Sequence, residues 1–125
     1  MKQYVFVYGT LKEGFGNHRV LSSSRKVADA VTCSDSYSMV DGGFPTVVLG
    51  GSFHVKGELY EVTDPDVMRN LDWLEGVPNL FVHHKTQVKA DSEIYDALMY
   101  VGASPRHTIG RNHVVPDEEN VLSWR

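Results

Sequence analysis

The sequence predicts an α+β fold built from a mixed, mainly antiparallel curved sheet or small β-barrel with one main helix. Most apolar positions fall in short runs rich in β-branched and aromatic residues, separated by glycine and polar turns, which is typical of many short strands. Only the segment from Pro65 to Glu75 combines helical apolar spacing with capping signals at both ends. Many strands with one dominant helix favour an α+β architecture.

The strands can be placed from their apolar runs and the turns between them. The run from Tyr4 to Tyr8 ends at Gly9 and predicts a buried strand that enters a tight loop. Partial burial on both faces is expected for His54 to Val62, because neither of its faces is purely polar. The other expected strands are Lys26 to Thr32, Tyr37 to Val40, Phe44 to Leu49, Leu80 to Lys89 and Ile94 to Val101, the last two forming a hairpin.

Two helices are expected. A short turn or helix from His18 to about Ser22 has Asn17 as its predicted N-cap. The main helix starts after Asp64, a plausible N-cap, with proline at the favoured first position. It should end near Glu75, because Gly76 suits the left-handed residue that commonly follows a helix.

The length and charge of the chain limit its class. We expect a single domain over residues 1–125, with the polar residues 103–125 as a tail packed on it. A net charge of −4 with scattered basic residues argues against a nucleic-acid partner. No run approaches the ~18 apolar residues that span a bilayer, and no cleavage signal follows the N-terminus, so no membrane association is expected. With its lone Cys33, the chain is predicted to be cytoplasmic, while its oligomeric state is left open.

The main helix carries a candidate acid/base group. Its apolar positions form one stripe that should face the core, and Glu75 follows Leu71 by four residues and Met68 by seven. Desolvation and the negative end of the helix dipole should both raise the pKa of this carboxyl towards neutrality, as a group that accepts and then delivers a proton requires. The alternative is a side chain that turns out to solvent. Asp72, one position off the stripe, is expected to cap, to pair with a basic residue or to face water.

The loop after the first strand is a candidate anion site. In Tyr8-Gly9-Thr10-Leu11, the glycine would let successive backbone N–H groups converge on a carboxylate. The Thr10 hydroxyl could add a donor and the Asn17 amide could close the far side of the pocket. An ordinary tight turn is the alternative. Tyr8 and Tyr100 are candidate wall residues, with a role as core aromatics as the alternative for Tyr100.

Several other chemistries find no support in the sequence. The adjacent histidines His83 and His84 should point to opposite faces of a strand, so a shared metal is not expected. No glycine-rich phosphate motif, CxxC pair or GxSxG elbow is present, which argues against nucleotide, redox and serine-hydrolase functions.

Four ordered motifs together resemble the γ-glutamylcyclotransferase-like family. They are Val7-Tyr8-Gly9-Thr10-Leu11-Lys12-x-Gly14-x-x-Asn17-His18, Phe44-Pro45, Val55-x-Gly57-Glu58-Leu59-Tyr60-Glu61-Val62 and Leu71-Asp72-x-Leu74-Glu75-Gly76. The stretch from Tyr8 to Leu21 is especially similar to the γ-glutamylamine cyclotransferase branch. One departure is that the family commonly has Tyr-x-Arg after the catalytic helix, whereas this chain has Phe81-Val82-His83.

The resemblance implies a barrel-like fold with a helix beside a single cavity. It also implies a substrate-holding loop at Tyr8 to Leu11 and a catalytic glutamate at Glu75. Members of the family release 5-oxoproline and a free amine from small γ-glutamyl substrates, so we expect a cyclotransferase without metal or cofactor. The alternatives are a non-catalytic binding module that holds a small carboxylate or amine metabolite in the same cavity, and an interaction protein in which Glu75 is structural.

Overall fold

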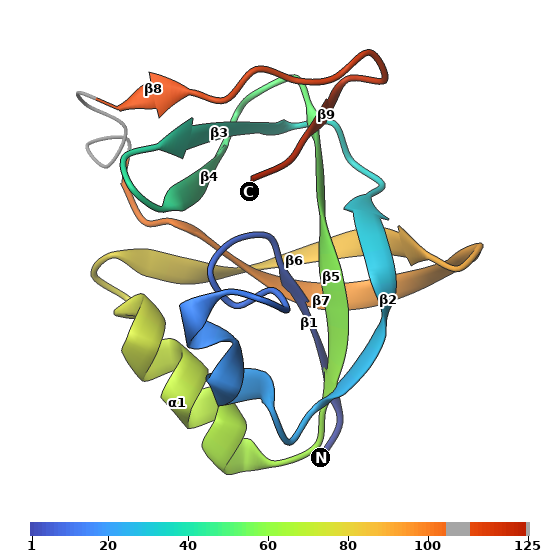
Figure 1. Ribbon diagram of the computed structural model, residues 1–125, viewed down its shortest axis with the longest axis vertical. Helices are drawn as coiled ribbons and strands as arrows, with labels where there is room; N and C mark the ends of the chain where they lie inside the picture. The colour runs from blue at the N-terminus through green and yellow to red at the C-terminus, as the bar shows by residue number, and fades with distance from the viewer. Residues whose placement is uncertain (105–110, 125) are drawn as a thin grey trace.

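Five long strands close into a small barrel in the computed structural model, which describes residues 1–104 and 111–124 (Figure 1). The order around the barrel is β1-β7-β6-β2-β5, and β5 pairs back with β1. The pairing of β1 with β7 is parallel and the other four are antiparallel. The predicted mixed, mainly antiparallel barrel is therefore confirmed. The strands are β1 (Gln3–Val7), β2 (Arg25–Thr32), β5 (His54–Val62), β6 (Phe81–Ala90) and β7 (Glu93–Gly102).

A smaller antiparallel sheet lies above the barrel in Figure 1. It has the order β4-β3-β8, from β3 (Tyr37–Asp41), β4 (Pro45–Leu49) and β8 (Asn112–His113). A further short strand, β9 (Val121–Leu122), pairs in parallel with the start of β5. The sequence did not predict the two short strands after residue 110. Residues 105–110 and 125 of the expected tail lie outside the described residues, and the single domain over 1–125 stays a prediction.

The main helix α1 (Pro65–Glu75) has the predicted bounds and caps. The Asp64 carboxylate accepts a hydrogen bond from the backbone N–H of Asp66 at 2.9 Å, and Gly76 adopts the left-handed conformation with φ 66°. Both ends of the helix are thus set by local sequence. The position of Glu75, in the last turn, is fixed by the same signals.

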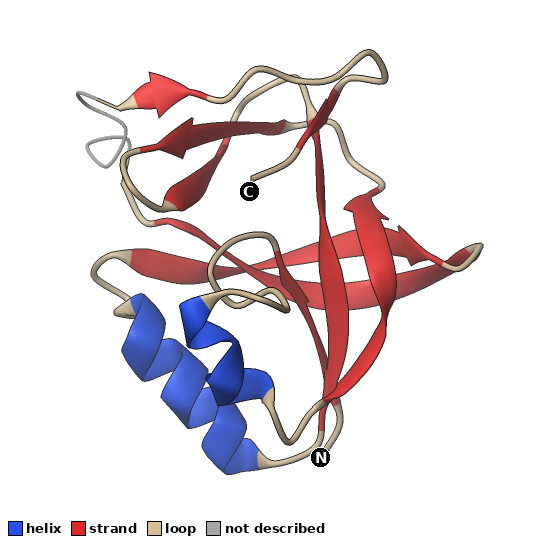
Figure 2. Ribbon diagram, in the orientation of Figure 1, coloured by secondary structure: helices blue, strands red, loops and turns tan. Residues whose placement is uncertain are grey.

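The short helix η1 (Gly16–Leu21) corrects one prediction. It is a 3₁₀ helix whose N-cap is Phe15, with no side-chain cap, so Asn17 as N-cap is wrong. Asn17 lies inside the helix, where its side chain is free to reach the preceding loop. Helices η1 and α1 lie side by side against the barrel (Figure 2).

The first strand, β1, separates two hydrophobic clusters. Because successive side chains on a strand point to opposite faces, Phe6 and Tyr8 pack into one cluster with the smaller sheet. Val5 and Val7 pack into the other, which includes residues of α1 and η1. The expected burial on both faces of β5 is confirmed by the buried Leu59 and Tyr60. The end of β1 therefore lies where the two clusters meet.

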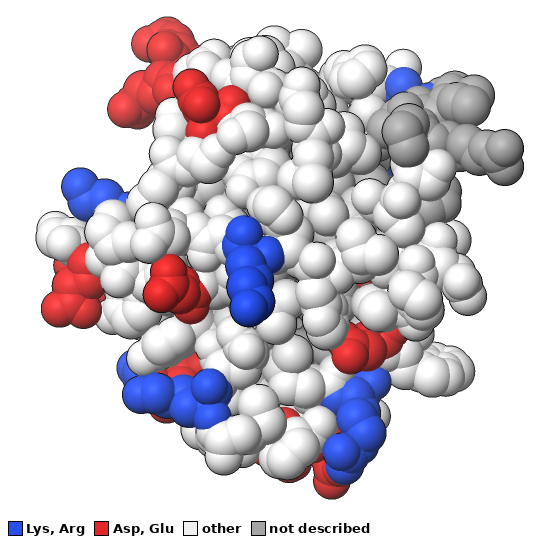
Figure 3. Space-filling model, turned by 180° about the vertical axis from the view of Figure 1, so that it is seen from behind, with Lys and Arg blue, Asp and Glu red and all other residues white. Residues whose placement is uncertain are grey.

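The surface and hydropathy of the chain add two observations. Within residues 1–104 and 111–124, no helix is both long and apolar enough to cross a membrane. On the face drawn in Figure 3, basic and acidic side chains lie interspersed. A cytoplasmic location and the lack of a nucleic-acid partner stay predictions.

Candidate functional site

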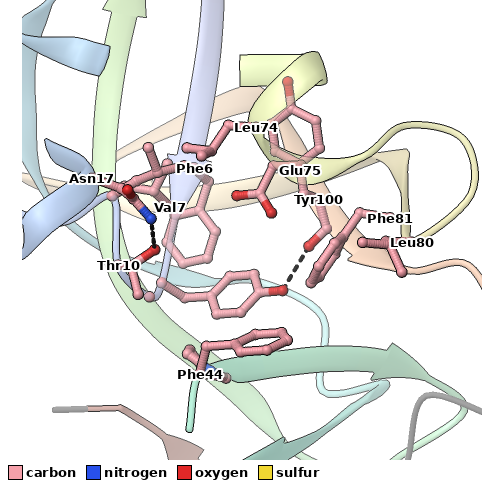
Figure 4. Close-up of a pocket in the computed structure, with 14 residues that line it drawn as sticks. Phe6, Val7, Thr10, Asn17, Phe44, Leu74, Glu75, Leu80, Phe81 and Tyr100 are labelled. Carbon is pink, nitrogen blue, oxygen red and sulfur yellow. Dashed lines mark hydrogen bonds between the residues drawn. The ribbon is translucent and has the colours of Figure 1, made fainter. Parts of the chain in front are cut away.

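A cavity of about 260 Å³ lies between the carboxyl end of β1 and the C-terminal end of α1 (Figure 4). Its size suits a small molecule, and its walls are largely apolar with a few polar groups, as is common for ligand sites. All seven residues singled out from the sequence line it: Tyr8, Gly9, Thr10, Leu11, Asn17, Glu75 and Tyr100.

Glu75 is partly buried at this cavity. In the described part of the chain, no hydrogen bond or ion pair to its carboxylate is present, and no Lys, Arg or His lines the cavity. Burial raises the pKa of this carboxyl to about 7. The expected contribution of the helix dipole stays a prediction. A carboxyl with such a pKa exchanges protons readily near neutral pH.

The loop after β1 is shaped by a close approach between Gly9 and Pro45. A Cβ atom at Gly9 would lie 2.6 Å from Pro45 Cγ, so any larger residue would force the two segments apart. The turn is closed by hydrogen bonds from Lys12 N to Gly9 O at 3.0 Å and from Asn17 N to Thr10 O at 3.2 Å. The backbone N–H groups of Gly9, Thr10 and Leu11 donate to no acceptor among residues 1–104 and 111–124. Free N–H groups beside a cavity suit a carboxylate or an oxyanion.

Thr10 and Asn17 form the polar side of the cavity. The Asn17 amide donates to the Thr10 hydroxyl oxygen at 2.9 Å (Figure 4). The Thr10 hydroxyl proton is then available for a ligand, because the oxygen already accepts. The side chain of Asn17 thus contacts the loop instead of capping η1.

The two predicted wall tyrosines are linked through the backbone. The Tyr8 hydroxyl donates to the Tyr100 carbonyl at 2.7 Å and accepts from the Val47 N–H at 3.1 Å. The Tyr100 hydroxyl donates to Asp72 Oδ1 at 2.6 Å. Burial raises the pKa of both phenols, and the nearby Glu75 charge raises them further. Both tyrosines therefore stay protonated and serve as walls and hydrogen-bond partners.

Of the three alternatives expected for Asp72, a contact with an imidazole is the one that the structure shows. His83 Nε2 lies 2.6 Å from Asp72 Oδ1, and the two rings of His83 and Tyr100 pack edge to face. His84 points to the other side of the strand, with its Nε2 3.1 Å from the Tyr37 hydroxyl. Across the described residues, no three His, Cys, Asp or Glu side chains gather as a metal site would require.

Most of the apolar wall was not predicted from the sequence. Phe44 and Pro45 belong to one of the motifs that carry the family resemblance, which was the available signal for them. Phe81 entered only as a departure from the family pattern, and nothing in the sequence pointed to Leu80. The remaining lining residues are Phe6, Val7, Phe44, Pro45, Leu74, Leu80 and Phe81.

A comparison with protein-family models matches residues 5–122 to the description "Gamma-glutamyl cyclotransferase, AIG2-like". The chain belongs to this family. It is 34% identical over 110 residues to γ-glutamylaminecyclotransferase B of Danio rerio, covering 77% of this chain and 57% of that protein. It is 39% identical over 95 residues to the γ-glutamylaminecyclotransferase of Rattus norvegicus, covering 69% and 63%. The prediction of an enzyme of this family is confirmed.

A solved structure supports the fold. An AIG2-like protein of Mus musculus superposes with a TM-score of 0.74 at 23% identity, covering 99% of this chain and 97% of that one. The chain spans less than two thirds of the length of the fish and rat relatives named above.

Proposed function

We propose that this family member converts a γ-glutamyl amide to 5-oxoproline and a free amine, with Glu75 as general acid and base. The observation that carries the proposal is an unpaired carboxyl with a pKa of about 7 at a small cavity, facing a loop with free backbone N–H groups. The family of this chain and the named activities of its fish and rat relatives support the same reaction class.

The reaction must overcome two obstacles at neutral pH. The α-amine of the substrate is protonated and cannot attack, and the leaving amine is too basic to depart without a proton. Ionised Glu75 removes a proton from the ammonium group, and the freed nitrogen attacks the γ-carbonyl carbon to close a five-membered ring. The same carboxyl then delivers the proton to the departing nitrogen as the carbon–nitrogen bond breaks. Ring closure leaves a second proton on the attacking nitrogen. The regenerated Glu75 carboxylate accepts this proton and passes it to the released amine, which departs as an ammonium ion, so that Glu75 ends ionised and atoms and charge balance.

The loop would hold the substrate for this attack. The N–H groups of Gly9, Thr10 and Leu11 would bind the α-carboxylate or the developing oxyanion, with the Thr10 hydroxyl as a further donor. Asn17 and Tyr8 would fix the two sides of the folded γ-glutamyl chain. Orientation alone gives effective molarities on the order of 10⁵ to 10⁸ M in favourable intramolecular reactions. Positioning by these residues would therefore contribute at least as much as proton transfer.

The test is the Glu75→Gln variant, which keeps the shape of the side chain and removes its acid/base function. Turnover of a γ-glutamyl amide should fall by roughly 10²- to 10⁴-fold, measured as 5-oxoproline release. The matched control is Glu119→Gln, the same change at an exposed position in the tail. Near-normal release by Glu75→Gln would reject the role of this residue.

The binding-module alternative predicts a different result. In that case the wild-type chain would bind 5-oxoproline or glutamate in calorimetry and release no product from any γ-glutamyl amide. The raised pKa of Glu75 favours the enzyme, because a carboxylate that only binds an ammonium group gains by staying ionised, whereas a proton-transfer group needs a pKa near the working pH.

A further inference from the structure

The cavity is polar on one side of the Glu75 carboxyl and apolar on the other. Thr10 and Asn17 lie on one side of this carboxyl, and Leu80 and Phe81 lie on the other (Figure 4). If the polar side holds the γ-glutamyl group, the leaving amine must extend towards the apolar side. This step rests on the cyclotransferase function proposed above.

The apolar side has features of a binding surface. The side chains of Phe44 and Leu80 are 42% and 55% exposed. Large apolar side chains that are exposed together at a cavity often mark a surface that binds an apolar group. Leu80 is held in place by its backbone, whose N–H donates to Gly76 O at 2.8 Å and whose carbonyl accepts from Ala103 N at 3.0 Å. The Leu80 side chain is thus presented at the cavity by a hydrogen-bonded backbone.

Phe44 is held by a neighbouring cation. The Arg111 guanidinium carbon lies 4.5 Å from the centroid of the Phe44 ring, and Arg111 Nη1 donates to Thr46 Oγ1 at 2.8 Å. Arg111 is not among the residues that line the cavity. Its charge is engaged by the Phe44 ring and the threonine hydroxyl.

The apolar side offers no partner for a second charge on the leaving amine. Glu75 is the only charged side chain among the described residues that line the cavity. A carboxylate or ammonium group placed between Phe44 and Leu80 would lose hydration without gaining a counter-ion. A hydrocarbon group would instead gain by burial, about threefold to fourfold in affinity per methylene.

We propose that the leaving amine carries an uncharged hydrocarbon group that lies against Phe44 and Leu80, and that amides whose leaving amine carries a second charge are disfavoured. The substrate class is then a γ-glutamyl alkyl or aryl amide. Phe44 and Leu80 act as specificity-determining residues, and neither takes part in proton transfer.

The test compares three γ-glutamyl amides of similar chain length, made from n-butylamine, 4-aminobutanoate and 1,4-diaminobutane. The value of kcat/KM for 5-oxoproline release should be at least tenfold higher for the butylamide than for either charged amide. Equal or faster release from a charged amide would overturn the inference while leaving the cyclotransferase function intact. If none of the three amides, γ-glutamyl-alanine or γ-glutamyl-ε-lysine releases 5-oxoproline, the proposed function itself fails, and this inference with it.

Variants of the apolar side test its contact with the leaving amine directly. Leu80→Asn should lower kcat/KM for the butylamide about fivefold to tenfold, with little change in kcat/KM for the two charged amides. Phe44→Ser is a second variant for which we expect the same pattern. Ile94→Asn is the matched control, because Ile94 is 56% exposed and does not line the cavity. A selective loss of activity on the 4-aminobutanoate amide in Arg111→Gln would contradict the inference, because it would show that Arg111 binds a leaving carboxylate.

Discussion

Glu58 on β5 and Glu75 at the end of α1 are both sheltered acidic side chains near the loop after β1, but the fold treats them differently. Glu58 Oε1 accepts from the Glu13 N–H at 2.9 Å and from the Tyr60 hydroxyl at 3.0 Å, and Lys26 Nζ lies 3.7 Å from its other oxygen. Glu75 has no such partner among the described residues. The fold satisfies one carboxylate internally and leaves the other for whatever enters the cavity.

This difference assigns the two groups to different tasks. A carboxylate that accepts two hydrogen bonds and pairs with a lysine helps to hold the chain, and here it ties the loop at Glu13 to β5. A desolvated carboxyl without a partner destabilises the folded state in its charged form, which is a cost that functional sites commonly carry. Removing the Glu58 carboxylate should therefore destabilise the fold, whereas removing the Glu75 carboxylate should lower activity and stabilise the fold.

The largest expected effect is on the pH dependence of activity. Because Glu75 must be ionised to accept the substrate proton, kcat/KM should approach a tenfold fall per pH unit below 7, or roughly a fiftyfold fall between pH 7 and pH 5. The substrate ammonium stays protonated over this range and does not contribute. The measurement is 5-oxoproline release across pH 5 to 8, with circular dichroism to verify the fold. If kcat/KM did not change over this pH range, Glu75 would behave like an ordinary carboxylate, and the difference from Glu58 would be contradicted.

The next effect concerns stability, where Glu75 and Glu58 should act with opposite signs. The folded pKa of Glu75 is raised above its ordinary value of 4.5, so its charge penalty is absent below pH 4.5 and fully present above pH 7. Glu75→Gln should therefore raise the free energy of unfolding at pH 8 by about 2 kcal/mol, after a discount for its partial exposure, and leave it unchanged at pH 4.

Glu58→Ala should lower the free energy of unfolding at pH 8 by about 2 kcal/mol. The substitution leaves the Glu13 N–H and the hydroxyl of the buried Tyr60 without their acceptor. Urea unfolding of both variants beside the wild type measures the two changes. Shifts of the same sign would mean that the two carboxylates do not differ as described.

A smaller effect is expected at the hydrogen bond that anchors Tyr100 on the far side of Glu75. Tyr100→Phe removes the donor to Asp72 and keeps both the ring and the carbonyl that accepts from Tyr8. The free energy of unfolding should fall by about 1 kcal/mol, with less than tenfold loss in kcat/KM. Tyr95→Phe, which removes a hydrogen bond to the exposed Glu93, should give no measurable change. A loss in turnover comparable to that of Glu75→Gln would instead make Tyr100 part of the chemistry.

Local signals explain which parts of the fold could be predicted from the sequence. The bounds of α1 followed from Asp64, Pro65 and Gly76, whose effects act within one helical turn. The long strands were placed to within about two residues of their bounds, because their apolar runs are continuous. The parallel contact of β1 with β7 was not predicted, because it joins segments more than 90 residues apart in the sequence.

The same distinction applies to the candidate site. Glu75 could be singled out because its helix spacing places it near the core. The importance of Gly9 was predicted for the convergence of N–H groups, but its contact with Pro45 depends on how two distant segments pack. Asn17 was expected to serve both as a cap and as a pocket residue, and it lines the pocket without capping η1. The exposed Leu80 carries no local pattern that would mark it as part of a cavity.

The most direct measurement is the titration of Glu75 itself, followed by carbon-13 NMR of the side-chain carboxyl in protein labelled at glutamate. Comparison with the Glu75→Gln spectrum identifies the resonance. We predict a titration midpoint near pH 7, because burial without a partner disfavours the charged form. A midpoint near 4.5 would contradict the proposed role of Glu75, since the carboxyl would then be solvated and unable to exchange protons with a substrate at neutral pH.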